Sequence, residues 1–236
     1  MASRRLRGCR FLLASLMVLL VLFPALEDMA KPILLIAIVA SVFVAGVVVV
    51  NPGRSRVRNA VTLAVIQVVL TGVAVALNEN SLAYVFTVGV GLATTAVLIV
   101  YSIYCVLRYV LQAIHITRDQ IYAGICVYLM LGFAFGCVYY LINILAPGCF
   151  AVNSPKLAAN SPDLMYFSFV TLATLGYGDI TPAAKAARAL AELEALAGML
   201  YMAVFMARLV SQHSAGGELA ATDKSRNLAA LDNRKG

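Results

Sequence analysis

Residues 171–182 read TLATLGYGDITP and differ in composition from the apolar chain around them. Gly176 and Gly178 stand on either side of a tyrosine, directly before an aspartate. Glycine adopts backbone dihedrals that clash for other residues, so its alternation with Leu175 and Tyr177 can aim successive carbonyl oxygens in one direction. Carbonyls aligned in this way, contributed by four chains around an axis, replace the water around a dehydrated cation. The stretch therefore predicts a cation site built from backbone.

A phosphate-binding loop is a second interpretation of the same glycines. Such a loop needs a strand before it, the amino end of a helix after it and a basic residue that reaches the phosphate. Here the apolar stretch 164–175 precedes the glycines, and Pro182 and another long apolar run follow them. The sequence also lacks a Cys-x-x-Cys pair and a histidine near its cysteines at metal-ligand spacing. We therefore do not expect an enzyme.

The amino-acid composition indicates whether the chain is surrounded by water or by lipid. Of its 236 residues, 62% are hydrophobic and 12% are charged. A soluble domain is closer to half apolar and a quarter charged, and a fold of this size cannot hide so much apolar surface inside itself. The sequence therefore predicts an integral membrane protein. The net charge of +7 would suggest nucleic acid in a soluble chain, but we expect no nucleic-acid partner here.

A helix that spans a membrane needs about 20 mostly apolar residues. The candidate spans are 11–26, 32–50, 59–77, a run from 82 past 104, 121–146 and 183–210. The first is short and follows four arginines, so it has the form of either a retained helix, which we favour, or a signal peptide. The stretch 164–175 is too short to cross and is expected to enter and return. The half-polar segment 105–120 predicts an amphipathic helix on the membrane surface.

The basic residues set the orientation of these spans. Most Lys and Arg side chains lie before the first span, in 51–58, in 108–118 and in the tail. Segments of this kind remain on the cytoplasmic side, and the intervening loops carry little basic excess. We therefore expect a multi-pass protein of the plasma (inner) membrane with both termini in the cytoplasm.

The nonapeptide TLATLGYGD resembles the selectivity-filter signature of potassium channels, which usually reads Thr-x-x-Thr-Val-Gly-Tyr-Gly-Asp. The resemblance implies ion-binding positions at Thr174, Leu175, Gly176, Tyr177 and Gly178, with K⁺ held at the first four. It also implies that Asp179 caps the outer mouth. Leu175 replaces the commoner valine, a change of little expected consequence because the carbonyl is the ligand. Tyr166 and Phe167 stand where the family often has two tryptophans that brace the filter.

The resemblance continues beyond the filter. Gly198 lies twenty residues after Gly178, where the inner helix of the family usually has its hinge glycine. Met199, Met202 and Met206 follow at helical spacing, so they can share the face that lines an apolar cavity. The alternative for these methionines is packing against neighbouring helices, which Met often does.

Two further features concern packing around the predicted site. Glu194 lies early in the last span, and an ionisable group at such depth is a functional hypothesis by default. We expect it to hydrogen-bond the pore helix behind the filter and so to support the filter. Gly132 and Gly136 form a Gly-x-x-x-Gly pair in the fifth span, a pattern suited to close helix packing.

These features together predict an all-α membrane protein in three parts. Residues 1–118 form a four-helix, voltage-sensor-like transmembrane domain with an amphipathic linker, 119–212 form a potassium channel pore domain, and 213–236 form a short disordered cytoplasmic tail. The layout resembles bacterial-type members of the six-transmembrane tetrameric potassium channels, with a two-helix pore and a re-entrant pore helix. One filter per chain requires four chains, hence a homotetramer. Beyond lipid and potassium ions we expect no other partner, cofactor or small-molecule substrate.

The fourth span bears on gating. Voltage-gated relatives carry basic residues at every third position there, because the movement of charge through the field supplies the opening energy. Residues 82–107 carry no charge, so we expect a leak-like or differently gated channel that passes K⁺ down its gradient. Two alternatives stay open: a weakly selective cation channel, and a subunit of a potassium-uptake transporter. The intact Gly-Tyr-Gly argues against the first, and the single filter copy argues against the second.

Overall fold

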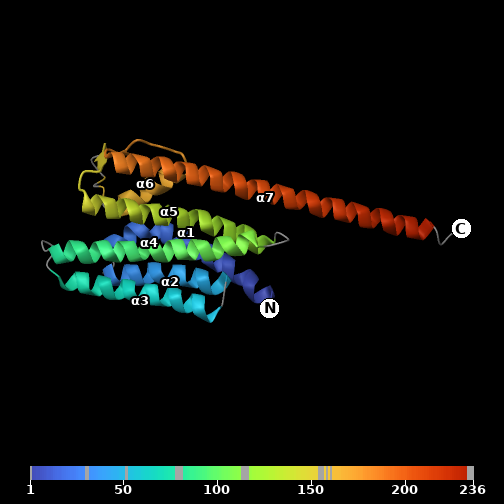
Figure 1. The fold of residues 1–236 in the computed structure, drawn as a ribbon, viewed down its shortest axis with the longest axis horizontal. Coiled ribbons are helices and arrows are strands. Elements are labelled where there is room, and N and C mark those ends of the chain that lie inside the picture. The colour runs from blue at the N-terminus through green and yellow to red at the C-terminus, as the bar shows by residue number, and fades with distance from the viewer. Residues whose placement is uncertain are drawn as a thin grey trace.

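The computed structural model describes residues 2–29, 32–50, 53–77, 82–112, 117–153, 157, 159 and 161–232. Within these ranges the chain forms seven helices and two short strands (Figure 1). The helices are α1 (Ala2–Met29), α2 (Pro32–Val50), α3 (Arg54–Ala76), α4 (Leu82–Leu111), α5 (Arg118–Leu145), α6 (Ser161–Leu172) and α7 (Lys185–Asp232). The strands β1 (Phe150–Val152) and β2 (Ile180–Pro182) pair antiparallel, with Ala151 opposite Thr181.

Four of the described helices are long and apolar enough to cross a membrane. They are α3, α4, α5 and the part of α7 from Lys185 to Ser211. In α1 and α2 the described residues hold shorter apolar segments, Gly8–Phe23 and Ala37–Val50. Each predicted apolar run thus lies largely within a helix, and α2 has the same bounds as the run predicted at 32–50. A total of six crossings stays a prediction.

The predicted amphipathic helix at 105–120 differs from the structure. Residues 105–111 are the last two turns of α4, and 118–120 already belong to α5; residues 113–116 lie outside the described ranges. A capping box separates the two helices, because the Thr117 amide donates a 2.7 Å hydrogen bond to the Gln120 side chain. Cys105, Val106 and Val110 are buried in the bundle as part of α4, so this part of the segment does not form a separate helix.

The predicted disordered tail at 213–236 also differs from the structure. Helix α7 continues without interruption to Asp232, and residues 233–236 lie outside the described ranges. Residues 218–232 read ELAATDKSRNLAALD, in which strong helix formers are frequent. The glycines at 216 and 217 cost only about 1 kcal/mol each relative to alanine, which a long helix tolerates.

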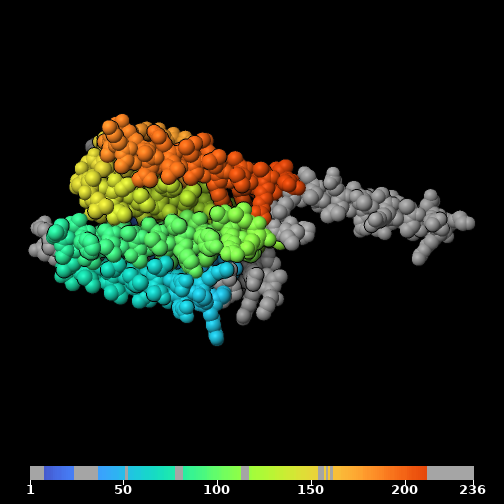
Figure 2. All heavy atoms as spheres, in the orientation of Figure 1, coloured from blue at the N-terminus to red at the C-terminus, as the bar shows by residue number. Residues whose placement is uncertain are grey.

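The helices form two layers. In the space-filling view α3 and α4 lie on one side, and the chain from α5 onward lies on the other (Figure 2). Helix α4 packs against α2, α3 and α5 and so joins the layers. The core between them contains Phe43 of α2 and Phe133 of α5, whose rings meet edge to face with centroids 6.0 Å apart. The chain from α5 onward is thus fixed on a packed peripheral bundle.

Helix α6 is held close against α5 by the two glycines of the fifth span. A Cβ atom on Gly132 would lie 2.6 Å from the ring of Phe169, and a Cβ on Gly136 would lie 2.6 Å from the sulfur of Met165. A larger residue at either position requires the Phe169 or Met165 side chain, or α6 itself, to shift. The predicted close packing at this Gly-x-x-x-Gly pair is confirmed.

Candidate functional site

Directly after α6, every second residue has a positive φ angle, in the left-handed region. The φ angles of Thr174, Gly176 and Gly178 are 57°, 58° and 77°, whereas Leu175 and Tyr177 are not among the positive-φ residues. Left-handed φ is free for glycine but costs free energy for threonine, so something in the surroundings must hold Thr174. This alternation is the backbone condition for carbonyl oxygens that point in one direction.

Hydrogen bonds from the last turn of α6 fix the start of this segment. The Thr174 amide donates to the carbonyl of Thr171 at 2.9 Å, and the Leu175 amide donates to the carbonyl of Val170 at 2.9 Å. Both bonds satisfy carbonyls that a helix end otherwise leaves without partners. The segment therefore leaves α6 in a defined direction.

The carboxyl-terminal end of the segment is tied to β1. The Asn153 amide donates to the carbonyl of Asp179 at 2.7 Å, and its side-chain Nδ2 donates to the carbonyl of Gly178 at 2.9 Å. These bonds extend the β1–β2 ladder to the last two residues of the GYGD stretch. The Gly178 carbonyl thus has its orientation fixed by a hydrogen bond from Asn153.

Tyr166 and Phe167 of α6 support the segment in different ways. The Tyr166 hydroxyl donates a 2.7 Å hydrogen bond to Oδ2 of Asp179, while Oδ1 of the same carboxylate accepts from the Ile180 amide at 3.0 Å. Phe167 instead lies in a buried aromatic cluster, with its ring centroid 5.1 Å from that of Tyr139 and 5.5 Å from that of Phe150. Tyr166 thus braces the carboxyl-terminal end of the segment at Asp179, and Phe167 packs α6 into the buried aromatic cluster.

Glu194 of α7 lies at the centre of a buried hydrogen-bonded group behind α6. Its side chain is fully buried; Oε2 accepts from the Tyr139 hydroxyl at 2.6 Å, and Oε1 lies 2.5 Å from Oγ of Ser168. The same Ser168 oxygen lies 2.8 Å from the carbonyl of Gly132. A serine hydroxyl carries one hydrogen, and a carbonyl can only accept. Both Ser168 contacts are hydrogen bonds at once only when Glu194 carries a proton and donates to Ser168.

Gly198 lies where α7 passes the end of α6. A Cβ atom on Gly198 would be 2.8 Å from the carbonyl oxygen of Leu172, and the same oxygen accepts from the Tyr128 hydroxyl at 3.1 Å. A glycine at position 198 therefore allows α7 to approach α6 closely. Helix α7 is continuous at this position, and a hinge there stays a prediction.

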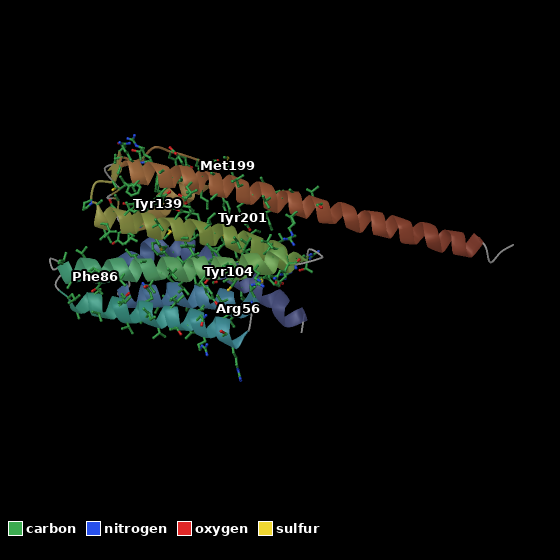
Figure 3. The ribbon with its side chains drawn as sticks, in the orientation of Figure 1. Arg56, Phe86, Tyr104, Tyr139, Met199 and Tyr201 are labelled. Carbon is green, nitrogen blue, oxygen red and sulfur yellow. The ribbon has the colours of Figure 1, made fainter. Side chains whose placement is uncertain are left out.

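The faces of α7 are divided between packing and exposure. The packed face carries Glu194, Gly198, Tyr201, Phe205 and Arg208, at alternating spacings of four and three residues. Tyr201 donates to the carbonyl of Gly124 on α5 at 2.6 Å. The three methionines Met199, Met202 and Met206 are exposed. Figure 3 shows Tyr201 on the side of α7 toward α5 and Met199 on the opposite side. Met199 therefore lies on the face of α7 away from α5, and all three methionines leave about half of their side chains exposed.

The side chains of the segment itself are open within one chain. Leu175 is 58% exposed and Tyr177 is 67% exposed. Within the described residues, no three His, Cys, Asp or Glu side chains gather into a metal site. Backbone oxygens of 174–177 are therefore the candidate cation ligands, and a single chain leaves the other side of any ion uncovered.

Several residues of the site have no signal in the sequence. Asn153 reaches Gly178 only because β1 pairs with β2, and Tyr139 reaches Glu194 across 55 residues. Arg208 donates to the carbonyl of Leu111 at 2.7 Å and so joins the end of α4 to α7. Each contact depends on how distant helices meet, which no local pattern encodes.

Comparison with known proteins agrees with this geometry. Residues 127–214 match a family model described as an ion channel. The match begins in α5, contains α6 and the GYGD stretch, and ends in α7. No curated protein and no solved structure matches the chain. The match supports an ion channel, and together with the apolar helices it supports a multi-pass membrane protein.

Proposed function

We propose that the chain is one subunit of a homotetrameric, potassium-selective channel, with residues 174–178 as its filter. The observation that carries the proposal is the alternation of φ at Thr174, Gly176 and Gly178 directly after a helix too short to cross a membrane. Four copies of this segment around an axis surround an ion with carbonyl oxygens in place of water. K⁺ is then the bound ion, and its ligands are the oxygens of residues 174–177.

The electrostatics of the segment favour a cation. The carboxyl end of α6 points to residue 174 and carries the negative end of the helix dipole. Residues 161–184 contain no Lys, Arg or His, and Asp179 supplies a carboxylate beside the proposed outer mouth. Within residues 161–184 an anion or a phosphate group finds no basic side chain; Arg188, beyond them, donates to the Pro182 carbonyl at 3.1 Å. The segment itself therefore gives the phosphate-loop interpretation no support.

Closure by symmetry accounts for the surfaces that one chain leaves open. A ring of four copies covers the exposed Leu175 and Tyr177 and gives the exposed faces of α7 a neighbour or a pore to face. The methionines at 199, 202 and 206 are then the candidate lining of the inner cavity. Isolated chains would expose these side chains without a partner.

We further propose that the peripheral helices α1–α4 do not sense voltage. Described residues 82–107 of α4 carry no charged side chain, so the field has little to act on in this helix. The channel is then leak-like or opens to another stimulus, in the plasma (inner) membrane, with six crossings and both termini in the cytoplasm. A weakly selective cation channel and a potassium-uptake subunit are the alternatives.

Flux into liposomes tests the proposal. The purified protein should carry K⁺ but not Na⁺ down a gradient, and Ba²⁺ should block the flux. Gly176→Ala should abolish it, because φ at Gly176 is +58°. Gly148→Ala is the matched control, because Gly148 also has a positive φ of +88° and nothing within 4 Å, but lies between α5 and β1. Equal K⁺ and Na⁺ flux would favour the weakly selective alternative.

A further inference from the structure

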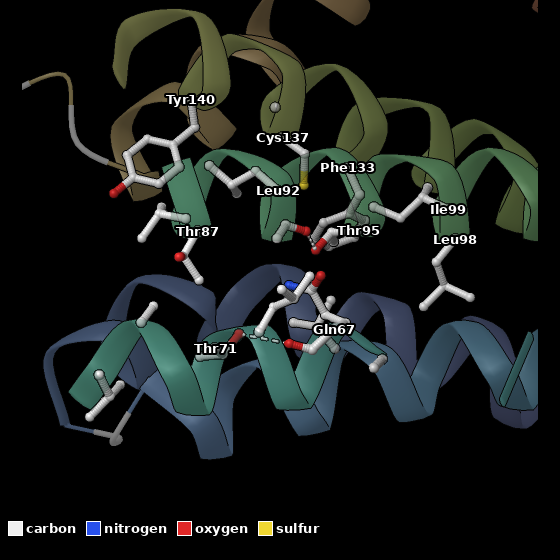
Figure 4. Close-up of a pocket in the computed structure, with 18 of the residues that line it drawn as sticks. Gln67, Thr71, Thr87, Leu92, Thr95, Leu98, Ile99, Phe133, Cys137 and Tyr140 are labelled. Atoms are coloured by element: carbon white, nitrogen blue, oxygen red, sulfur yellow. Dashed lines mark hydrogen bonds between the residues drawn. The ribbon is translucent and has the colours of Figure 1, made fainter. Parts of the chain in front are cut away.

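A cavity of about 410 Å³ lies between α3, α4 and α5, away from the proposed filter. It lies within the range of roughly 300–1,000 Å³ that is common for sites of small molecules. Figure 4 shows side chains from all three helices directed into it. None of the lining side chains is charged, and most are apolar. The cavity therefore suits a mainly apolar molecule and excludes an ion.

Gln67 of α3 brings an unusual polar group into this cavity. Its side chain is 2% exposed, and its oxygen Oε1 has no hydrogen-bond partner. In Figure 4 the amide rises from α3 toward Thr95 and Phe133. A buried acceptor without a partner costs roughly 1–3 kcal/mol, so such groups are rare in folded proteins. The position calls for a donor that the protein itself does not provide.

The three threonine hydroxyls that line the cavity cannot be that donor. Thr71 donates to the carbonyl of Gln67 at 3.0 Å, Thr95 donates to the carbonyl of Gly91 at 3.0 Å, and Thr87 donates to the carbonyl of Ala83 at 2.7 Å. Each threonine hydroxyl has one hydrogen, which it donates to a backbone carbonyl of its own helix. Their oxygens face the cavity as further acceptors. The three threonines of this wall can thus accept hydrogen bonds but have no hydrogen left to donate.

We propose that this cavity binds a membrane-dissolved alcohol, an apolar molecule whose single hydroxyl donates to Oε1 of Gln67. The apolar body then lies against Leu98, Ile99 and Phe133. Met165 of α6 also lines the cavity, so the bound molecule touches both the peripheral helices and the helix that precedes the filter. A water molecule is the weaker occupant, because a buried water makes about three hydrogen bonds and most of this wall is apolar. The inference does not depend on ion selectivity.

The chain offers matched variants for a test. Gln67→Leu removes the acceptor with little change in volume, and it removes an unsatisfied group, so it should not harm folding. Gly91→Val fills part of the cavity, because a Cβ there meets nothing closer than 3.9 Å. Gly72→Val is the control: Gly72 also lies within a helix with nothing within 4 Å of a Cβ, but it does not line the cavity.

Photolabelling in lipid nanodiscs tests the proposal directly. The full chain is irradiated with a diazirine-bearing octanol, and the adducts are mapped by mass spectrometry. We expect adducts on residues that line the cavity, which 1-decanol suppresses and decane, at the same membrane concentration, does not. Gln67→Leu should raise the concentration for half-maximal labelling roughly tenfold. Gly91→Val should abolish labelling, and Gly72→Val should leave it unchanged.

The contrary outcomes are equally specific. Equal competition by decane would show that the hydroxyl plays no part and would overturn the proposal. Labelling that persists in both Gln67→Leu and Gly91→Val, adducts only outside the cavity, or no adducts at all would also overturn it. None of these readouts requires an open channel, so failure here is distinguishable from failure of the proposed function.

Discussion

The side-chain amide of Asn153 donates a 2.9 Å hydrogen bond to the carbonyl oxygen of Gly178, 25 residues further along the chain. The same residue uses its backbone amide to bind the carbonyl of Asp179 at 2.7 Å. Asn153 therefore ties the last glycine of the proposed filter to the β1–β2 ladder. Any rotation of the Gly178 peptide must first break this contact.

Asn153→Ala should consequently loosen the outer end of the filter. The lost amide–carbonyl bond is worth about 1 kcal/mol, and we expect K⁺ conductance to decay faster and the K⁺/Na⁺ flux ratio to fall. Asn143→Ala is the control, because Asn143 makes the same kind of bond, from Nδ2 to the carbonyl of Ala159 at 3.0 Å, outside residues 174–179. If both variants lowered the flux ratio equally, the specific role of Asn153 would be refuted.

Tyr166→Phe should weaken the brace between α6 and the outer mouth. It removes the 2.7 Å hydrogen bond to the Asp179 carboxylate, and a bond to a charged group contributes roughly 1.5–3 kcal/mol. We expect faster loss of K⁺ current during sustained opening. Tyr104→Phe also deletes a hydroxyl, one that accepts from Arg108 at 2.9 Å, and should leave the current unchanged. Currents of equal duration in wild type and Tyr166→Phe would contradict the brace.

The Glu194 group makes a prediction about charge. A protonated Glu194 lets both Ser168 contacts be hydrogen bonds, and Glu194→Gln then supplies an N–H donor to Ser168 and still accepts from Tyr139. We expect its thermal midpoint in detergent to remain close to that of wild type. Glu194→Leu leaves the buried Tyr139 hydroxyl without its acceptor, at a cost of roughly 1–3 kcal/mol, and should lower the midpoint.

Infrared spectroscopy checks the same point independently. The difference spectrum between wild type and Glu194→Gln should contain the carbonyl stretch of a protonated carboxyl group. A carboxylate signal in that spectrum, or a Gln variant as unstable as the Leu variant, would show that Glu194 is ionised and that the hydrogen-bond assignment is wrong.

Close packing at Gly132 predicts that a glycine-to-alanine substitution lowers the thermal stability there, whereas the same substitution at the uncrowded Gly72 does not. Gly132→Ala places a methyl group 2.6 Å from the Phe169 ring, and overpacking of this kind costs roughly 1–3 kcal/mol. Gly72→Ala meets nothing within 4 Å and gains up to about 1 kcal/mol of helix propensity. Thermal midpoints should fall for the first and rise or stay level for the second. A stable Gly132→Ala protein would refute close contact between α5 and α6.

Much of the local architecture could be predicted from the sequence. The helices, the short α6 and the close packing at Gly132 all follow from apolar run lengths and glycine spacing, which are local properties. The segment 105–120 is not one helix, because α4 ends at Leu111 and α5 begins at Arg118. Tyr109 donates to the buried Asp119 at 3.2 Å, and Arg208 binds the end of α4. Half-polar spacing alone does not distinguish these partners from a membrane surface.

The contacts that support the candidate site could not be predicted from the sequence, because they also depend on tertiary structure. The sequence could propose Glu194 from its depth in an apolar run, but Tyr139 and Ser168 come from two other helices and are ordinary residues in their own segments. The unpartnered oxygen of Gln67 could not be predicted either. A single glutamine in an apolar helix gives the same sequence pattern whether or not its side chain has a hydrogen-bond partner. Such features require the coordinates of several helices at once.

The reversal potential under bi-ionic conditions tests the central claim most directly. With K⁺ on one side of a planar bilayer and Na⁺ at equal concentration on the other, carbonyls spaced by the φ alternation at residues 174–178 should pass K⁺ alone. We predict a large reversal potential of the sign set by K⁺, lost in Gly176→Ala and retained in Gly148→Ala. A reversal potential near zero in the wild-type protein would contradict potassium selectivity.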